Sequence, residues 1–407
     1  MKPFERNQTL TKAYELAIEE VKQAGLTAKV KTHDKDKLIF SVCELYANDK
    51  KVCQGLGKGM SASPATVGAI FESLEHYYCQ TFSEIEPEYH EYKQINQLPE
   101  AIKQDYVIDF ISKEDPQSIY PCTQYKNIQT NETLDYPVEL TFPESLSTND
   151  YRNTLLKYSS GNGRSIGTNY NEALLHGLNE IIERQAISYF LIHHFILNPN
   201  TPITVTKNES LPIYIQQKIR LAEDKYGIEI AVIKLKHFFN SHVYLAIPLN
   251  GSFTYIHTCG AGSSLSEEVA CQRAVSELIQ CLHPLTAEMK ADKFREYQEI
   301  NEVSSQLANC YAIKLQNKKI VYENYANSHI TALTIIDQLK IIKDNFYEQR
   351  YSILVKIIHE SDNCCCLSIV VPNMSRFHLI TSANVVLPSM SCIEDTKLVY
   401  QENLVVS

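Results

Sequence analysis

Three segments of the chain repeat one spacing of small and polar residues. Each has a small residue, a second small residue four places on, and acidic or amide side chains at places seven and ten; the segments begin at Ala65, Ala173 and Ala270. Positions three and four apart share a helix face, so each segment predicts a helix with a close-packing stripe beside two polar groups. The polar groups are Glu72 and Glu75, Glu180 and Glu183, and Glu277 and Gln280. Paired glutamates repel each other on a bare helix, so they indicate a cation between them.

The remaining hydrophobic pattern predicts alternating helices and strands. A helix is predicted over residues 8–24, with Gly25 just past its end, where a terminating glycine is expected. Extended segments are predicted at residues 38–46, 106–111, 138–143, 228–235, 243–248, 352–358, 367–371 and 378–381. Glycine-rich loops at residues 55–64, 159–168 and 258–264 precede the three motif helices. This pattern is typical of an α/β domain with repeated strand–glycine loop–helix units.

The length and composition allow a large core. The chain has 407 residues, 44% of them hydrophobic, which suffices for one large domain or two to three lobes. We expect an N-terminal lobe over residues 1–82, a polar connecting or inserted lobe over 83–152, a core over 153–290 and a C-terminal α/β lobe over 291–407.

Charge and cysteine spacing exclude several classes of protein. The net charge of −10 argues against a nucleic-acid surface, which needs clustered Lys and Arg. The polar N-terminus lacks the core of a signal peptide, and the most apolar stretches are too short to span a bilayer. We therefore expect a cytoplasmic protein. The 12 cysteines include no Cys-x-x-Cys pair, so their spacing disfavours a structural zinc site.

Candidate chemistry centres on anion and cation binding. The Gly57-Lys58-Gly59 sequence is not a P-loop, which needs Ser or Thr after the lysine. It fits instead an anion site formed by backbone amides and Lys58 before a helix. Carboxylates converging from several helices suit Mg²⁺, which bridges acids to phosphates, although solvated helix faces would give the same periodicity. Arg184 and Arg273 supply planar donors for phosphate oxygens or for the carboxylates themselves.

Taken together, these segments resemble the YcaO family of ATP-dependent amide-activating enzymes. The match is closest over residues 159–184, SSGNGRSIGTNYNEALLHGLNEIIER, which resembles that family's second nucleotide motif. Residues 57–75 resemble the first motif, residues 262–280 the third, and residues 6–26 the opening helix. The likeness spans nearly the whole chain, and three motifs in order make it specific.

The resemblance implies a single YcaO-type domain that binds ATP with more than one Mg²⁺ in a glutamate-lined pocket. By position, the implied metal ligands are Glu72, Glu75, Glu172, Glu180, Glu183 and Glu277, and the implied nucleotide contacts are Lys58, Ser165, Thr168, Arg184, Arg273 and Arg6. No catalytic residue is assigned. Three positions depart from the family pattern: Thr168 stands where many members carry Asn, His76 replaces an Arg, and Arg6 replaces a Lys.

The implied activity is phosphorylation of a peptide backbone amide oxygen. In azoline-forming members, a Cys, Ser or Thr side chain attacks the preceding amide, whose oxygen then leaves as phosphate. We expect this thiazoline- or oxazoline-forming cyclodehydration of a ribosomally made precursor peptide, as in bacteriocin and antibiotic biosynthesis. Such members often end in a proline-rich tail, whereas the last proline here is Pro388. Thioamide or amidine formation therefore stays an alternative, as does a non-catalytic ATP-binding accessory role.

The resemblance also implies partners. The 407 residues show no separate leader-binding domain, so we expect an E1-like partner that binds the leader peptide, or a sulfur-delivery partner for a thioamide product. We also expect a dehydrogenase partner and assembly as a homodimer or a hetero-oligomer.

Overall fold

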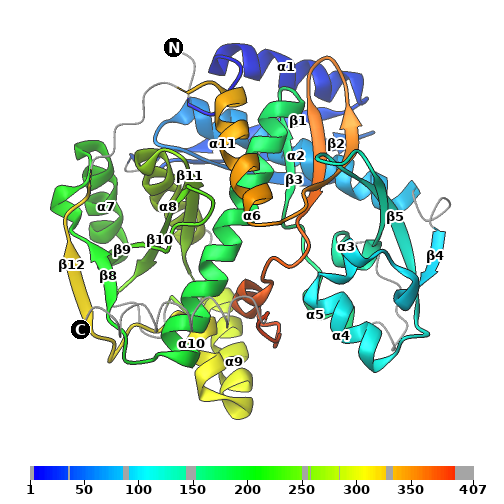
Figure 1. The fold of residues 1–407 in the computed structure, drawn as a ribbon. Helices are drawn as coiled ribbons and strands as arrows, with labels where there is room; N and C mark the ends of the chain where they lie inside the picture. The colour runs from blue at the N-terminus through cyan, green and yellow to red at the C-terminus, as the bar shows by residue number, and fades with distance from the viewer. Residues whose placement is uncertain are drawn as a thin grey trace.

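Three β-sheets surround a central helix in this computed structural model. It describes residues 4–34, 37–85, 91–143, 153–249, 255–256, 258–283, 285–326 and 333–389. The helix α6 (Tyr170–Leu191) runs through the middle of the molecule (Figure 1). It is apolar nearly all round and buried along most of its length, as expected for a helix enclosed by other elements. The α/β fold predicted from the sequence is confirmed.

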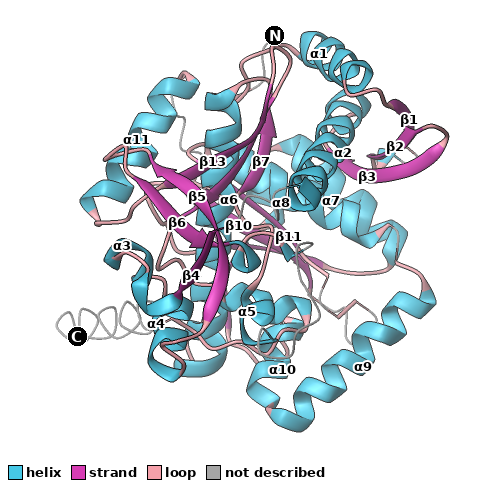
Figure 2. Ribbon diagram, turned by 90° about the vertical axis from the view of Figure 1, so that its right-hand side faces the viewer, coloured by secondary structure: helices cyan, strands magenta, loops and turns pink. Residues whose placement is uncertain are grey.

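The first sheet is antiparallel and belongs to the N-terminal part. Its order is β1 (Thr27–His33), β2 (Phe40–Ala47) and β3 (Lys50–Lys58). The helix α1 (Leu10–Gln23) precedes it, and Gly25 follows α1 with a φ of 72°, as predicted. The long helix α2 (Ala62–Ile85) follows β3 and packs against this sheet (Figure 2).

The second sheet lies beside α6 and α8. Its strand order is β11-β10-β9-β8-β12, with the bounds β8 (Ile203–Thr206), β9 (Ile230–Lys234), β10 (His242–Pro248), β11 (Gly260–Ser264) and β12 (Ile320–Glu323). Only the β8–β12 pair among these is parallel. The helix α8 (Glu267–Leu282) follows β11 and is capped by the Ser266 side chain.

The third sheet joins distant parts of the chain. Its strand order is β4-β5-β13-β14-β7, with β6 paired to β5, and the bounds are β4 (Glu91–Gln94), β5 (Ile119–Asn127), β6 (Thr133–Pro137), β7 (Arg164–Gly167), β13 (Leu354–Glu360) and β14 (Cys365–Val370). The edge strand β7 pairs with β14 and leads into α6. The C-terminal hairpin therefore supports the start of the central helix.

Seven further helices lie in the described part of the chain. They are α3 (Glu100–Lys103), α4 (Tyr106–Glu114), α5 (Asn153–Tyr158), α7 (Ile213–Tyr226), α9 (Ala287–Val303), α10 (Ser305–Ala312) and α11 (Ile335–Glu348). A π-helical turn, Ile192–Leu197, extends α6, and 3₁₀ turns lie at Ile95–Gln97, Val138–Leu140, Asn208–Ser210 and Phe377–Ser382. Within the described ranges no helix is long and apolar enough to cross a membrane.

The glycine-rich segments are strands only in part. Residues 55–58, 164–167 and 260–264 are extended, which corrects the prediction of loops there, whereas residues 59–61 and 159–163 lie outside strands, as predicted. Gly55 and Gly57 lie in β3, Gly167 in β7, and Gly260 and Gly262 in β11. Each strand packs directly onto the backbone of the helix that follows it, where a Cβ on Gly57 would lie 1.7 Å from the Ala65 carbonyl oxygen. The small residues of the repeated pattern therefore meet the glycines of the preceding strand.

This packing predicts a large loss of stability for Gly57→Ala. A new Cβ meets rigid helix backbone, so thermal or urea denaturation should show a loss of about 3 kcal/mol or more. Gly227→Ala is the matched control, because Gly227 has a φ of +64° but nothing within 4 Å of a new Cβ. The control should lose about 1 kcal/mol. Equal stability of the two variants would contradict the strand–helix packing.

Three other extended segments were predicted wrongly. Residues 106–111 lie in α4, where Asp105 caps the helix and the β-branched residues Val107, Ile108 and Ile111 form its buried face. Residues 138–143 begin with a 3₁₀ turn, and residues 378–381 lie within the 3₁₀ segment Phe377–Ser382. The predicted strands at 38–46, 228–235, 243–248, 352–358 and 367–371 correspond to β2, β9, β10, β13 and β14. The end of the chain, which was compared with the proline-rich tail, lies outside the described residues from residue 390 on.

Candidate functional site

The motif helices bring five glutamates into mutual electrostatic range. They are Glu72 and Glu75 on α2, Glu180 and Glu183 on α6, and Glu277 on α8. Burial, with Glu72 adding to it, raises the pKa of Glu75 to about 7. Burial also raises the pKa of Glu180 to about 8, and Glu75, Glu183 and Glu277 contribute to that rise. Carboxylates from three helices therefore lie near one another, and we call them the acidic cluster.

Glu183 and Glu72 behave in the same way. Burial and then Glu277 raise the pKa of Glu183 to about 7, and burial raises the pKa of Glu72. Backbone amides of Ile166 and Leu56 donate to Glu75 and Glu72, which ties α2 to the strands β7 and β3. The positive charges near these acids do not offset the effect of burial on their pKa values, so the cluster favours a further cation.

Two cations border the acidic cluster. Lys58, the last residue of β3, forms an ion pair with Glu277, and Arg184 Nε lies 4.0 Å from Glu183 Oε1. Burial alone would lower the pKa of Arg184, but Glu183, Glu180 and Glu277 raise it overall. Both side chains are about one-third exposed, at 39% for Lys58 and 33% for Arg184, so solvent or a ligand can reach them.

Glu172 lies at the start of α6, eight residues before Glu180. Its Oε1 atom lies 3.0 Å from Arg6 Nη1, and its Oε2 atom accepts hydrogen bonds from the Asn7 amide at 3.0 Å and the Thr168 hydroxyl at 2.7 Å. Asn169 caps the helix and also accepts a hydrogen bond from the Asn7 side chain. The N-terminal segment is thus held against the beginning of α6.

Glu5 makes the matching contact with α8, and no sequence pattern indicated it. Its Oε2 atom lies 2.7 Å from Arg273 Nη2, and its Oε1 atom accepts from the Ser264 hydroxyl. Arg273 also donates to the Ser263 carbonyl at 3.0 Å. Glu5 is buried and has a φ of 61°, a left-handed conformation that is uncommon for this residue type. The segment before α1 therefore connects the second and third motifs.

Two polar residues of α6 complete the site and were not predicted. His176 is one turn from both Glu172 and Glu180; burial and the charges of Arg6, Arg273 and Lys58 lower its pKa, which keeps the imidazole neutral. Asn179, one turn before Glu183, is 2% exposed, and neither atom of its amide has a hydrogen-bond partner among the described residues. Helical spacing from the acidic residues could have found both.

Ser165 and Thr168 have different environments. The Ser165 side chain is fully buried in β7, donates to the Ala173 carbonyl at 2.8 Å and lies against Gly177. Thr168 is nearly buried and holds Glu172. In this conformation Ser165 joins strand to helix, whereas Thr168 orients an acid.

The donor set fits a nucleotide with Mg²⁺. Carboxylate oxygens with uncompensated charge suit a hard divalent cation, and the orphaned Asn179 amide offers a further oxygen. Lys58, Arg184, Arg273 and Arg6 are cations at the edge of the same arrangement.

A family comparison agrees with this fit. The model described as YcaO cyclodehydratase, ATP- and Mg²⁺-binding, matches residues 56–375. The chain belongs to the YcaO family. This match confirms the family resemblance and the expected cofactors, ATP and Mg²⁺. A search of curated proteins found no match to this YcaO chain.

Solved structures show the same fold. A YcaO from Methanopyrus kandleri bound with AMPPCP and Mg²⁺ has a TM-score of 0.64 and 14% identity, covering 95% of this chain and 97% of that one. A heterocyclase in complex with substrate and cofactor has a TM-score of 0.65 and 14% identity, covering 91% and 53%. A chain of the E. coli microcin synthetase McbBCD complex with pro-MccB17 bound has a TM-score of 0.56 and 16% identity, covering 86% and 88%.

Proposed function

We propose that this YcaO chain uses ATP to phosphorylate a backbone amide oxygen of a peptide. The observation that carries the proposal is the acidic cluster, which gathers glutamates from α2, α6 and α8 beside Lys58 and Arg184. Family membership supports an ATP-dependent enzyme of the cyclodehydratase type.

The residues divide into two roles. The acidic cluster would hold Mg²⁺, with the Asn179 amide as a further oxygen or hydrogen-bond donor. Lys58, Arg184 and Arg273 would contact the phosphates, while Arg6 and Glu172 orient one another at the same edge. We assign Glu172 to this orienting role, because Arg6, Asn7 and Thr168 already contact both its oxygens.

The chemistry follows from the poor leaving ability of an amide oxygen. Phosphorylation converts that oxygen into phosphate, which leaves readily. Mg²⁺, when bound, supplies positive charge that offsets the charge of the transferring phosphoryl group. Lys58, Arg184 and Arg273 add fixed positive charge around it, and the backbone-packed strands β3, β7 and β11 hold their helices rigidly in place.

The product we propose is an azoline formed from Cys, Ser or Thr in a precursor peptide. The family description as cyclodehydratase and the fold shared with a heterocyclase support this choice. One similar structure is the McbBCD complex with pro-MccB17 bound, which supports a peptide substrate and partner proteins here as well. We propose a leader-binding partner of the E1-like type for this chain.

Product mass tests the proposal. Purified protein, ATP, Mg²⁺ and a short Cys/Ser/Thr-rich peptide encoded by a neighbouring gene should give phosphate and a peptide lighter by one water per modified residue. In a parallel reaction with added sulfide, exchange of oxygen for sulfur would identify a thioamide instead. ATP hydrolysis with an unchanged peptide, in the presence of the neighbouring partner protein, would contradict peptide modification.

Removal of the Arg6 side chain should weaken nucleotide use. Arg6→Ala deletes one of the cations that border the site and frees Glu172, so the KM for ATP should rise about tenfold, which corresponds to about 1.4 kcal/mol. Steady-state phosphate release measures this change. Lys12→Ala on α1 is the control, because Lys12 only forms an exposed pair with Glu15. An unchanged KM in Arg6→Ala would place Arg6 outside the nucleotide site.

A further inference from the structure

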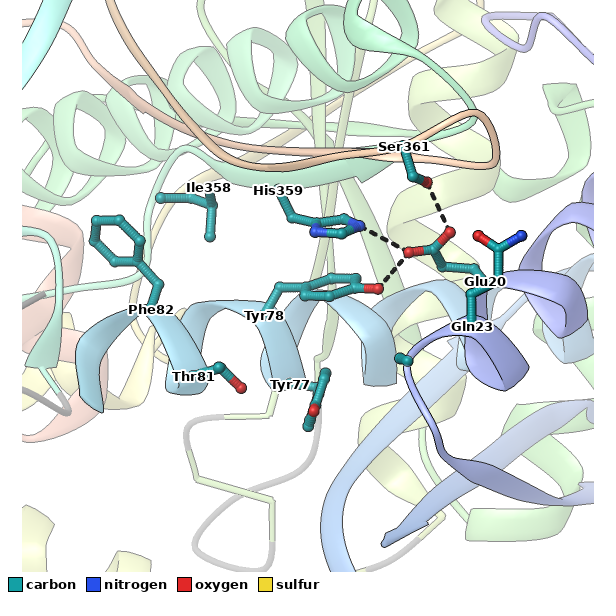
Figure 3. A pocket seen from close by; sticks show the side chains of 10 residues that line it. Glu20, Gln23, Tyr77, Tyr78, Thr81, Phe82, Ile358, His359 and Ser361 are labelled. Atoms are coloured by element: carbon teal, nitrogen blue, oxygen red, sulfur yellow. Dashed lines mark hydrogen bonds and ion pairs between the residues drawn. The ribbon is translucent and has the colours of Figure 1, made fainter. Parts of the chain in front are cut away.

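A second charged cluster lies between α1 and the β13–β14 hairpin. Its centre is Glu20, which is 2% exposed. Glu20 Oε1 accepts from the Tyr78 hydroxyl and lies 2.7 Å from His359 Nε2, and Oε2 accepts from Ser361 Oγ at 2.7 Å (Figure 3). Oε2 also accepts from Asn363 Nδ2 at 3.2 Å. Burial alone would raise the pKa of Glu20, but these four side chains lower it overall. A charged carboxylate is therefore buried here.

The hairpin adds two further metal-type donors. They are His359 and Cys364, which lie five residues apart. One ligand atom from each of Glu20, His359 and Cys364 lies within 4.8 Å of the other two. Cys364 is fully buried, and its sulfur lies 3.9 Å from Ser361 Oγ. Carboxylate, imidazole and thiolate together are a donor set that zinc takes, unlike the all-oxygen set that suits Mg²⁺.

A cavity of about 630 Å³ opens beside these donors. Glu20, His359 and Ser361 line it together with Tyr77, Phe82 and Ile358. The His359 imidazole stacks on the Tyr78 ring, with centroids 3.7 Å apart and an interplanar angle of 7°, which fixes the plane of the imidazole (Figure 3). The cavity leaves room for a water or a ligand group at an open coordination position.

We propose that Glu20, His359 and Cys364 bind a zinc-class divalent cation, with one coordination position open to the cavity. Glu20 Oε1 would exchange its contact with His359 for the metal, while Ser361 and Asn363 keep Oε2 oriented, as hydrogen-bond partners of metal-bound carboxylates do. His359 would bind through Nε2, with its ring proton moved to Nδ1. Cys364 would lose its thiol proton to solvent as the metal binds, so one proton is released for each ion.

The cation would connect three parts of the fold. Glu20 lies near the end of α1, and α1 follows the segment that carries Glu5 and Arg6 to the nucleotide site. The hairpin strand β14 pairs with β7 through Cys365↔Gly167 to Ser368↔Arg164, and β7 leads into α6. Metal binding would therefore fix the position of α1 relative to β7, away from the acidic cluster.

Cobalt titration tests the proposed site. Full-length protein is treated with a chelator, dialysed and titrated with Co²⁺ as the spectroscopic probe. We expect one equivalent to give a thiolate-to-cobalt absorption band that Zn²⁺ displaces and excess Mg²⁺ does not. Co²⁺ bound at the carboxylates of the nucleotide site cannot give this band, because no thiolate is among those ligands.

Two cysteine variants make the test specific. Cys364→Ser should lose the band, whereas Cys365→Ser should keep it. Cys365 is equally buried, but it packs among the apolar side chains around α6, whereas Cys364 packs among those of α1, α2 and β2. His359→Ala should weaken Co²⁺ binding at least about tenfold, and Ser361→Ala about 10- to 100-fold. Circular dichroism checks that each variant is folded. If Cys364→Ser does not fold, the Co²⁺ affinity of His359→Ala tests the site instead.

Three results would overturn the site. They are a folded wild-type protein with no band, a band that persists in folded Cys364→Ser, and His359→Ala that binds Co²⁺ as tightly as wild type. Each would mean that Glu20 and His359 form only a hydrogen-bonded pair that holds the hairpin to α1.

Discussion

Glu183→Gln should lose ATP turnover by at least about a thousandfold while the protein stays folded, a cost of about 4 kcal/mol in transition-state stabilisation. Glutamine keeps the shape of the side chain but removes the charge that a metal needs. Glu183 is the most buried member of the acidic cluster, and Glu277, Arg184, Lys58 and Arg273 all affect its pKa. Phosphate release with the cognate peptide and partner is the measurement.

Glu84→Gln is the matched control for this variant. Glu84 lies on α2 but is exposed and interacts with Gln80, so its loss should leave turnover unchanged. Thermal unfolding of both variants checks the fold. Full turnover in Glu183→Gln would remove Glu183 from the metal site.

The second large effect is a pH dependence of Mg²⁺–nucleotide binding. In the metal-free protein the pKa values of Glu75, Glu180 and Glu183 are raised to about 7, 8 and 7. These acids are therefore largely protonated below neutral pH, and a cation must displace their protons. Affinity should rise with pH through this window, by up to about tenfold per pH unit for each proton released.

The same shifts determine how stability changes with pH. An acid whose pKa is raised by folding stabilises the fold most below its unfolded pKa, and that contribution is lost as pH rises through the folded value. The metal-free protein should therefore lose stability from about pH 4.5 to about pH 8, and Mg²⁺ with AMPPCP should restore it.

Thermal shifts caused by Mg²⁺ and AMPPCP, compared at about pH 6 and above pH 8, measure this dependence. Glu180→Gln should release one proton fewer than wild type when it binds Mg²⁺ and AMPPCP. This difference distinguishes the titration of the protein's acids from the titration of the nucleotide. A thermal shift that is equal at both pH values would contradict the raised pKa values of the cluster.

The sequence predicted the three motif helices because their spacing is local. Acidic residues at places seven and ten lie on one helix face regardless of tertiary structure. The glycine segments were predicted as loops because glycine disfavours strands. In the fold, only glycine lets β3, β7 and β11 approach the helix backbone, so tertiary packing overrides that preference.

Contacts between distant residues could not be predicted. Glu5 reaches Ser264, 259 residues away, and Glu20 reaches His359, 339 residues away. No spacing pattern along the chain joins these residues. Residues 106–111 were predicted as a strand because a β-branched run favours strands. The Asp105 cap and the helical spacing of the apolar residues instead stabilise α4.

Calorimetric titration with AMPPCP most directly tests the claim that three helices form one Mg²⁺–nucleotide site. Wild-type protein should bind the analogue only with Mg²⁺ present. Glu75→Gln on α2 and Glu277→Gln on α8 should each weaken binding at least about tenfold, and Glu84→Gln should not. Binding that needs no Mg²⁺, or that is as tight in Glu75→Gln or Glu277→Gln as in wild type, would contradict the site.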